Sequence, residues 1–195
     1  MGLAEVERWF FRAYGRRPRE GEVKVGTLDN PGWMFVVRLP DAPQDRVIVG
    51  CDPNDPDEAW IDVRLRGGTF QANSGPRQLG ELIGHLLAYP GLPRTPPPSD
   101  ASIACLVEWY YSRCDRDWEH QGGLRITSLG NGWSLELNLN AFYRPEPTYK
   151  APLGGELRLD DDLVKVQGPH SAITDFLLEL RPLPPGTNTG PNPWM

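Results

Sequence analysis

Five side chains that can take part in chemistry fall within seven residues, between Cys114 and His120. They are a thiol, three carboxylates and an imidazole, in the order Cys114-Asp115-Arg116-Asp117-Trp118-Glu119-His120. A thiol near an imidazole can form a nucleophile with its general base, and the same groups can bind metal ions. No Cys-x-x-Cys or His-x-x-x-His spacing accompanies them, so we expect no metal and no other cofactor.

The same segment also has a structural interpretation. Cys114 would then be a small buried residue at the end of a helix, with Trp118 in the core and an aspartate at the helix end. Glu119 and His120 are less easily explained by packing, because glutamate is rarely buried without a partner. We therefore interpret these two as part of a polar network or of a surface that faces a partner.

Two further segments are rich in polar residues. The run Asp29-Asn30-Pro31-Gly32 has the composition of a tight turn, and a turn followed by a core Trp33 is its simplest interpretation. The segment 51–58 is acidic, but it lacks the residue order of a calcium-binding loop. An acidic loop of this kind would speed association with a basic partner. Its carboxylates belong to Asp52, Asp55, Asp57 and Glu58.

The elements that position these segments form two similar halves. Trp9 aligns with Trp109, and Trp33 with Trp133, about a hundred residues later. Hydrophobic periodicity predicts helices near 3–14 and 102–114, and helices that follow Gly75-Pro76 and Gly168-Pro169. Between the helices it predicts strands at 23–27, 33–39, 46–49, 60–66 and 69–72, and at 124–128, 133–139, 156–159 and 163–167.

Strands grouped between helices are typical of the α+β class. We expect two tandem repeats, each a helix, an antiparallel sheet of about four strands and a second helix. The first repeat would span residues 1–90 and the second 101–182. Residues 91–100 would form a proline-rich linker, and 183–195 a flexible tail.

Composition limits the setting of the protein. The 195 residues carry a formal net charge of -6, which disfavours a nucleic-acid binder or a binder of anionic membranes. Three cysteines form no paired framework, which favours reduced thiols in the cytoplasm. The sequence shows neither a signal-peptide pattern nor an apolar run of the roughly 20 residues that span a membrane.

Two pieces of the sequence resemble the signature of the immunity protein 53 family. They are WYYSRCDRDWEHQGGLRI, from Trp109 to Ile126, and TLDNPGW, from Thr27 to Trp33. The family pattern joins both pieces in one domain, whereas this chain divides them between its halves. The second half has Gly130-Asn131-Gly132-Trp133 in place of the turn, and the first half has the basic run 15–20 in place of the charged segment. We therefore expect the two incomplete copies to form one composite surface across a pseudo-two-fold axis.

The resemblance implies a cytoplasmic, non-enzymatic protein that binds and neutralises a cognate toxin of a bacterial polymorphic toxin system. The acidic segments favour a basic toxin as the partner. An alternative is a family member recruited as a peptide-tailoring enzyme, with His120, Glu119 and Asp117 as catalytic residues in a cleft between the repeats. A third interpretation is a scaffold, in which the charged segment only holds the repeats together. The expected partner-binding residues are Asp115, Asp117, Trp118, Glu119, His120, Asp29, Asn30, Asp55, Asp57 and Glu58.

Overall fold

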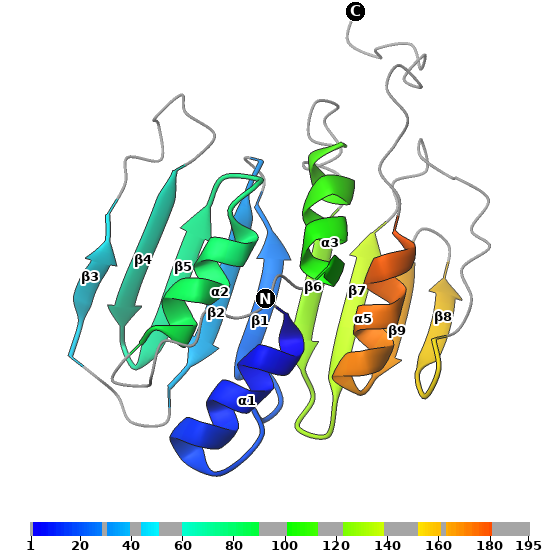
Figure 1. The fold of residues 1–195 in the computed structure, drawn as a ribbon, viewed down its shortest axis with the longest axis horizontal. Helices are drawn as coiled ribbons and strands as arrows, with labels where there is room; N and C mark the ends of the chain where they lie inside the picture. Colours follow the sequence, from blue (N-terminus) through cyan, green and yellow to red (C-terminus); the bar gives the residue numbers. More distant parts are fainter. Residues whose placement is uncertain are drawn as a thin grey trace, which may run out of the picture.

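The computed structural model describes eight stretches of the chain: residues 2–28, 31–39, 44–50, 60–89, 101–112, 123–138, 152–160 and 163–180. They contain four α-helices and a nine-stranded antiparallel sheet, an α+β fold (Figure 1). Helix α1 (Leu3–Tyr14) begins the first half, and α2 (Leu79–Leu87) ends it. Helix α3 (Ala101–Tyr111) begins the second half, and α5 (His170–Glu179) ends it.

The strands of the first half are β1 (Val23–Thr27), β2 (Trp33–Arg38), β3 (Arg46–Val49), β4 (Ile61–Arg66) and β5 (Thr69–Ser74). Those of the second half are β6 (Gly123–Ser128), β7 (Trp133–Asn138), β8 (Glu156–Asp160) and β9 (Leu163–Gly168). In the sheet they lie in the order β3-β4-β5-β2-β1-β6-β7-β9-β8. Outward from the centre, β1, β2, β5 and β4 of the first half correspond to β6, β7, β9 and β8 of the second. Strand β3 has no counterpart among the described strands of the second half.

The two halves meet where β1 pairs with β6 in antiparallel register. Val25 lies opposite Ile126, with Lys24 opposite Thr127 and Gly26 opposite Arg125. Val25 also pairs with Phe35 in β2, as Ile126 pairs with Leu135 in β7. A pseudo-two-fold axis thus passes between Val25 and Ile126, and the two repeats share one continuous sheet.

Alternation along the strands explains the layers. In β2 the side chains of Trp33, Phe35 and Val37 are buried, and the residues between them are not. This period of two places apolar residues on one face of a strand. Figure 1 shows that all four helices cover this same face. The apolar face forms the core against the helices, whereas residues such as Lys24, Arg64 and Arg125 point to the uncovered face and are exposed.

Helix α1 illustrates how the sequence determines an element. Leu3, Val6, Trp9 and Phe10 are buried at helical spacing. The helix ends at Gly15, whose φ of 66° is in the left-handed region and whose N–H bonds to the carbonyl of Phe11 at 2.9 Å. No helix in the described part of the chain is long and apolar enough to cross a membrane.

Several boundaries differ from the sequence-based expectation by one to three residues; for example, α3 ends at Tyr111 rather than at 114, and β5 continues to Ser74 rather than ending at 72. Helix α2 begins at Leu79, and not directly after Gly75-Pro76, because Gly75, Pro76 and Gln78 form a turn at the end of β5. Strand β4 begins at Ile61, one residue after Trp60. The alternation in β4 is confirmed, with Ile61, Val63 and Leu65 buried. The expected linker and tail lie outside the described residues.

Candidate functional site

All ten expected partner-binding residues lie outside the described part of the chain. The structure does describe the residues at which these segments begin and end. Leu28 and Pro31 flank the segment 29–30, Gly50 and Trp60 flank 51–59, and Ser112 and Gly123 flank 113–122. The positions of these flanking residues show whether the segments leave the fold at the same place.

The first two segments to compare are 29–30 and 113–122. Strand β1 runs toward 29–30, and its neighbour β6 starts directly after 113–122. The Leu124 N–H donates a hydrogen bond to the Thr27 hydroxyl oxygen over 3.1 Å. The two segments therefore leave the sheet at the same end, although they belong to different repeats.

Helix α3 reaches the same end. The Gly32 N–H donates to the Tyr110 hydroxyl at 2.9 Å, and the Tyr110 ring lies 4.6 Å from the Trp33 ring. Both aromatic side chains are fully buried. The end of α3, just before 113–122, is thus fixed to the turn of the other repeat (Figure 1, upper end).

The acidic segment 51–59 ends at Trp60, beside the same glycine. A Cβ atom on Gly32 would lie 3.3 Å from the Trp60 ring and only 2.3 Å from the carbonyl oxygen of Ser74. The Trp60 carbonyl also accepts the Gly75 N–H at 2.9 Å. We call this place, made by Thr27, Gly32, Trp60, Tyr110 and Leu124, the signature end of the sheet.

The segments that adjoin the signature end are rich in acidic residues. Eight acidic and two basic residues fall within the segments 29–30, 51–59 and 113–122. The described residues that flank all three segments lie at this end of the sheet. The acidic residues are Asp29, Asp52, Asp55, Asp57, Glu58, Asp115, Asp117 and Glu119; the basic ones are Arg113 and Arg116.

The pseudo-two-fold axis places the equivalent residues at the opposite end. There a Cβ on Gly132 would lie 2.5 Å from the carbonyl oxygen of Gly168, which repeats the contact of Gly32 with Ser74. The run 15–20 occupies the position of the charged segment, and it is basic. Its Arg16 forms two hydrogen bonds to the Glu22 carboxylate, at 2.6 and 2.7 Å.

At that opposite end, Glu22 accepts hydrogen bonds from two arginines. Its side chain is buried and also accepts the Arg19 N–H at 2.7 Å. The hydrogen bonds from Arg16, followed by the one from the Arg19 backbone, outweigh burial and hold the pKa of Glu22 below its ordinary value. The Ser128 hydroxyl donates to the Arg19 carbonyl at 2.5 Å, which attaches the 15–22 loop to the second repeat.

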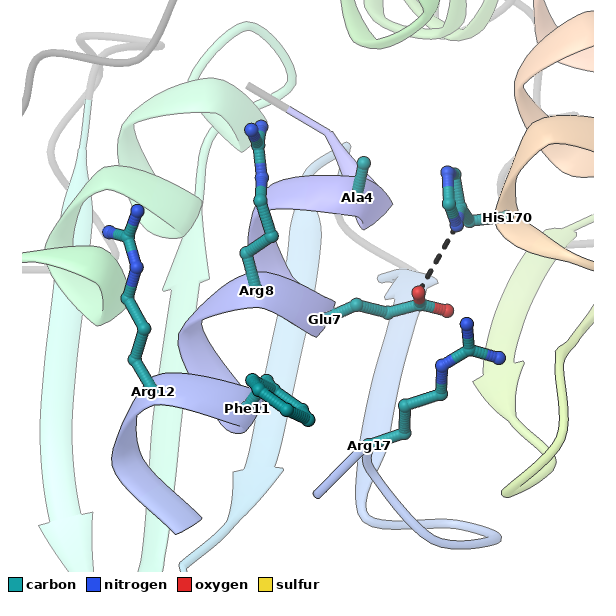
Figure 2. Close-up of a pocket in the computed structure, with 7 residues that line it drawn as sticks. All are labelled: Ala4, Glu7, Arg8, Phe11, Arg12, Arg17 and His170. Atoms are coloured by element: carbon teal, nitrogen blue, oxygen red, sulfur yellow. Dashed lines mark hydrogen bonds and ion pairs between the residues drawn. The ribbon is translucent and has the colours of Figure 1, made fainter. Parts of the chain in front are cut away.

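A groove runs along α1 toward α5, with a volume of about 560 Å³ (Figure 2). On one side, Glu7 accepts the indole N–H of Trp133 at 2.6 Å and lies 3.1 Å from Nδ1 of His170. Phe11 is 63% exposed. Neither Arg12 nor Arg17 forms an ion pair with another described residue. Guanidinium groups beside an aromatic ring suit an anionic ligand. The groove is lined by Ala4, Glu7, Arg8, Phe11, Arg12, Arg17 and His170.

No local sequence pattern marks Glu7 or His170 as functional residues. Glu7 occupies the polar face of an amphipathic helix, where glutamate is ordinary, and His170 stands alone at the start of α5. Only the alignment of Trp33 with Trp133 hints at a partner, because a buried indole N–H needs an acceptor. Trp33 finds its acceptor within its own repeat, at the Pro76 carbonyl, whereas Trp133 finds Glu7 in the other repeat. No group of three or more potential metal ligands occurs among the described residues.

The sequence of the chain also matches a known protein family. The sequence model of the family "Immunity protein 53" matches residues 3–89 and 103–149, which is more than half of the chain. The chain therefore belongs to the immunity protein 53 family. The match falls in two segments, one in each repeat. No curated protein and no solved structure gives a significant match.

Proposed function

We propose that this protein is a cytoplasmic immunity protein that binds and neutralises a cognate bacterial toxin at the signature end of the sheet. Family membership supports the class of function. The observation that supports the place is the convergence around Gly32 of Tyr110, Trp60 and the Thr27–Leu124 bond, which come from both repeats. The two separated pieces of the family signature are joined to the fold at that one end.

The fold provides a rigid base for such a surface. Strands β1, β2 and β6 hold the flanking residues in fixed register, and Trp33 and Tyr110 are packed in the core below them. A prearranged surface binds more tightly, because less conformational entropy is lost when the complex forms. Neutralisation then requires only that the bound immunity protein covers the functional surface of the toxin.

The acidic residues have two roles in this proposal. The carboxylates of Asp115, Asp117 and Glu119 would contact basic groups of the toxin, and Trp118 would be an apolar anchor. His120 and the turn residues Asp29 and Asn30 would supply directed hydrogen bonds. The excess of acidic over basic residues would raise the association rate with a basic toxin, and this effect would decrease as salt is added.

In this proposal the acidic segment 51–59 would extend the same surface. Its end at Trp60 is fixed beside Gly32, so the loop leaves the fold next to the turn. Charges at the rim of an interface act mainly on the association rate. Asp55, Asp57 and Glu58 would therefore increase the association rate more than they slow dissociation.

The experiment begins with a pull-down of the tagged protein from its own cell lysate, followed by mass spectrometry. The expected result is one stoichiometric protein that carries a toxin domain. Binding of that protein is then measured by calorimetry with wild type and Glu119→Ala, and we expect the variant to bind at least about tenfold more weakly. The control is Glu20→Ala, which removes an exposed carboxylate at the opposite end of the sheet.

The outcomes separate the proposal from its alternatives. Equal affinity of Glu119→Ala and wild type, with both folded, would contradict the assignment of the site. A pull-down that yields a small peptide together with modifying enzymes would contradict the function and favour the peptide-tailoring enzyme. Equal loss of affinity in Glu20→Ala would show a general effect of charge rather than a site.

A further inference from the structure

The outer edges of the two repeats differ. In the first repeat the sheet continues past β4 to β3, which pairs with β4 through Arg46–Leu65 and Val49–Val63. In the second repeat β8 is the last strand of the described sheet. An unpaired edge strand presents a row of free N–H and C=O groups to which another strand can bind.

Strand β8 is the counterpart of β4, as the register shows. From Val25 and Ile126, the cross-strand pairs lead outward through Phe35 and Leu135, then through Ala72 and Val166, to Val63 in β4 and Leu157 in β8. The next residues on the same face are Leu65 and Leu159. The likeness extends to charge, because Arg64 pairs with Asp62 at 2.9 Å and Arg158 pairs with Glu156 at 3.2 Å.

Burial differs at the equivalent positions of the two outer strands, β4 and β8. Leu65, beside β3, is 2% exposed, whereas its counterpart Leu159 is 53% exposed. Of the six large exposed hydrophobic residues of the described chain, four belong to the segment from Leu153 to Leu178. They do not form one patch, because Leu159 pairs with the buried Val164, whereas the adjacent Leu163 points to the other face of the sheet; Leu159 is the one at the edge on the face of the core. The four are Leu153, Leu159, Leu163 and Leu178.

We propose that β8 pairs edge to edge with β8 of a second copy of this chain, which gives a two-fold dimer with one sheet through both molecules. This goes beyond the proposed function and does not depend on it. In a two-fold dimer the same strand meets itself in antiparallel direction. The sequence of β8, Glu156-Leu157-Arg158-Leu159-Asp160, must then complement its own reverse.

It does so in two registers. If Leu159 lies on the two-fold axis, Arg158 of each copy lies opposite Asp160 of the other. If Leu157 lies on the axis, Arg158 lies opposite Glu156 instead. Opposite charges directly across a strand pair are favourable, and like charges are unfavourable. The side chains of Arg158 and Glu156 pair with each other but are 76% and 70% exposed, so both are accessible to a second copy.

The apolar residues agree with the charges. Either register places Leu157 or Leu159 against its own copy, on the face where Leu65 packs in the first repeat. A second β8 would thus cover Leu159 in the same way that β3 covers Leu65. The position of β3 beside β4 shows that this fold accepts a strand at that place.

The experiment is sedimentation equilibrium of the full chain from about 1 to about 100 µM, a range that detects dissociation constants in the micromolar region. We expect a monomer–dimer equilibrium. Arg158→Asp places acidic groups opposite acidic groups in both registers, and we expect it to raise the dissociation constant at least about tenfold, since every substitution occurs twice in the dimer. Leu159→Lys should act in the same direction.

The decisive variant exchanges all three charges. Glu156→Arg with Arg158→Asp and Asp160→Arg reverses the pattern but keeps it self-complementary, so we expect the dimer to return. Arg64→Asp is the matched control, because it makes the same change at the equivalent position of β4, which β3 already covers. Circular dichroism shows whether each variant is folded; Leu159 and Arg158 are exposed, so folding should persist.

Three results would overturn the proposal. The first is a monomer over the whole concentration range. The second is a dimer that Arg158→Asp and Leu159→Lys leave unchanged, which would assign association to another surface. The third is a monomer whose β8 amides become protected from hydrogen exchange only when the toxin binds, which would assign this edge to the toxin.

Discussion

Val25 and Ile126 lie opposite each other where the two repeats meet, and they are also equivalent residues of the two repeats. Both are buried, Val25 to 2% exposure and Ile126 to none. A residue pair on the axis belongs equally to both repeats. The stability of one repeat should therefore depend on the other.

The first prediction concerns Ile126→Ala. The cavity should lower the free energy of unfolding by about 2–5 kcal/mol and should do so for the whole chain. Denaturant unfolding followed by tryptophan fluorescence and by circular dichroism should give one coincident transition, shifted to lower denaturant. Two separate transitions, only one of them shifted, would mean that the repeats unfold independently.

The second prediction concerns the contact between Glu7 and Trp133. Glu7→Ala leaves a buried indole N–H without an acceptor, so we expect a loss of about 1–3 kcal/mol. Glu7→Gln keeps an acceptor oxygen and should lose less. Trp133→Phe removes the donor, and a double-mutant cycle with Glu7→Ala should show a coupling energy above about 0.5 kcal/mol. Additive effects of the two substitutions would indicate that the hydrogen bond contributes nothing.

The third prediction concerns two equivalent glycines. In Gly32→Ala and Gly132→Ala the new methyl group would meet a carbonyl oxygen at 2.3 and 2.5 Å, so both strands must shift. We expect each variant to lose about 1–3 kcal/mol of stability. Gly80→Ala is the control, since its Cβ meets nothing within 4 Å and it lies inside α2. That substitution should stabilise the protein by up to about 1 kcal/mol, because alanine favours helix.

The two glycine variants should differ in their effect on toxin binding. Gly32 lies at the signature end and Gly132 at the opposite end. Gly32→Ala should therefore weaken binding of the toxin more than Gly132→Ala does, at similar stability. Equal affinities of the two folded variants would contradict the location of the binding surface.

The fourth prediction concerns pH. Because Arg16 lowers the pKa of Glu22 in the folded state, the ionised carboxylate stabilises the fold. This contribution is present in full above the ordinary pKa of 4.5 and is lost as the pH falls through the lower pKa of the folded state. Urea unfolding should show that wild type loses more stability than Glu22→Gln between about pH 5 and pH 2. Parallel curves for the two proteins would exclude this role of Glu22.

Local patterns in the sequence predicted most of the elements. The spacing of Val6, Trp9 and Phe10 identified α1, and alternation in Ile61, Val63 and Leu65 identified β4. These patterns are readable because burial follows the period of the backbone itself. Helix α2 began later than expected because Gly75-Pro76 turns the chain before the helix starts, and composition alone does not distinguish a turn from a cap.

Contacts between distant residues were not readable in the same way. Glu7 and Trp133 are 126 residues apart, and neither position departs from its local pattern. The pairing of β1 with β6 is also nonlocal, so nothing in the sequence states that the repeats share a sheet. The separation of the family signature into two complementary pieces predicts a composite surface, and the described residues that flank the two pieces do meet at one end of the sheet. The binding roles of its residues, Glu119 and His120 above all, remain predictions.

The antiparallel joining of β1 to β6 has a consequence for stoichiometry. A protein with a single repeat could build this same sheet as a homodimer, but its two ends would then be identical by symmetry and would bind two toxins. Duplication of the repeat within one chain lets the ends change independently. Here one end joins both signature pieces, and the other holds the Arg16–Glu22 pair. One chain should therefore neutralise one toxin molecule, and a titration should end at a molar ratio of one.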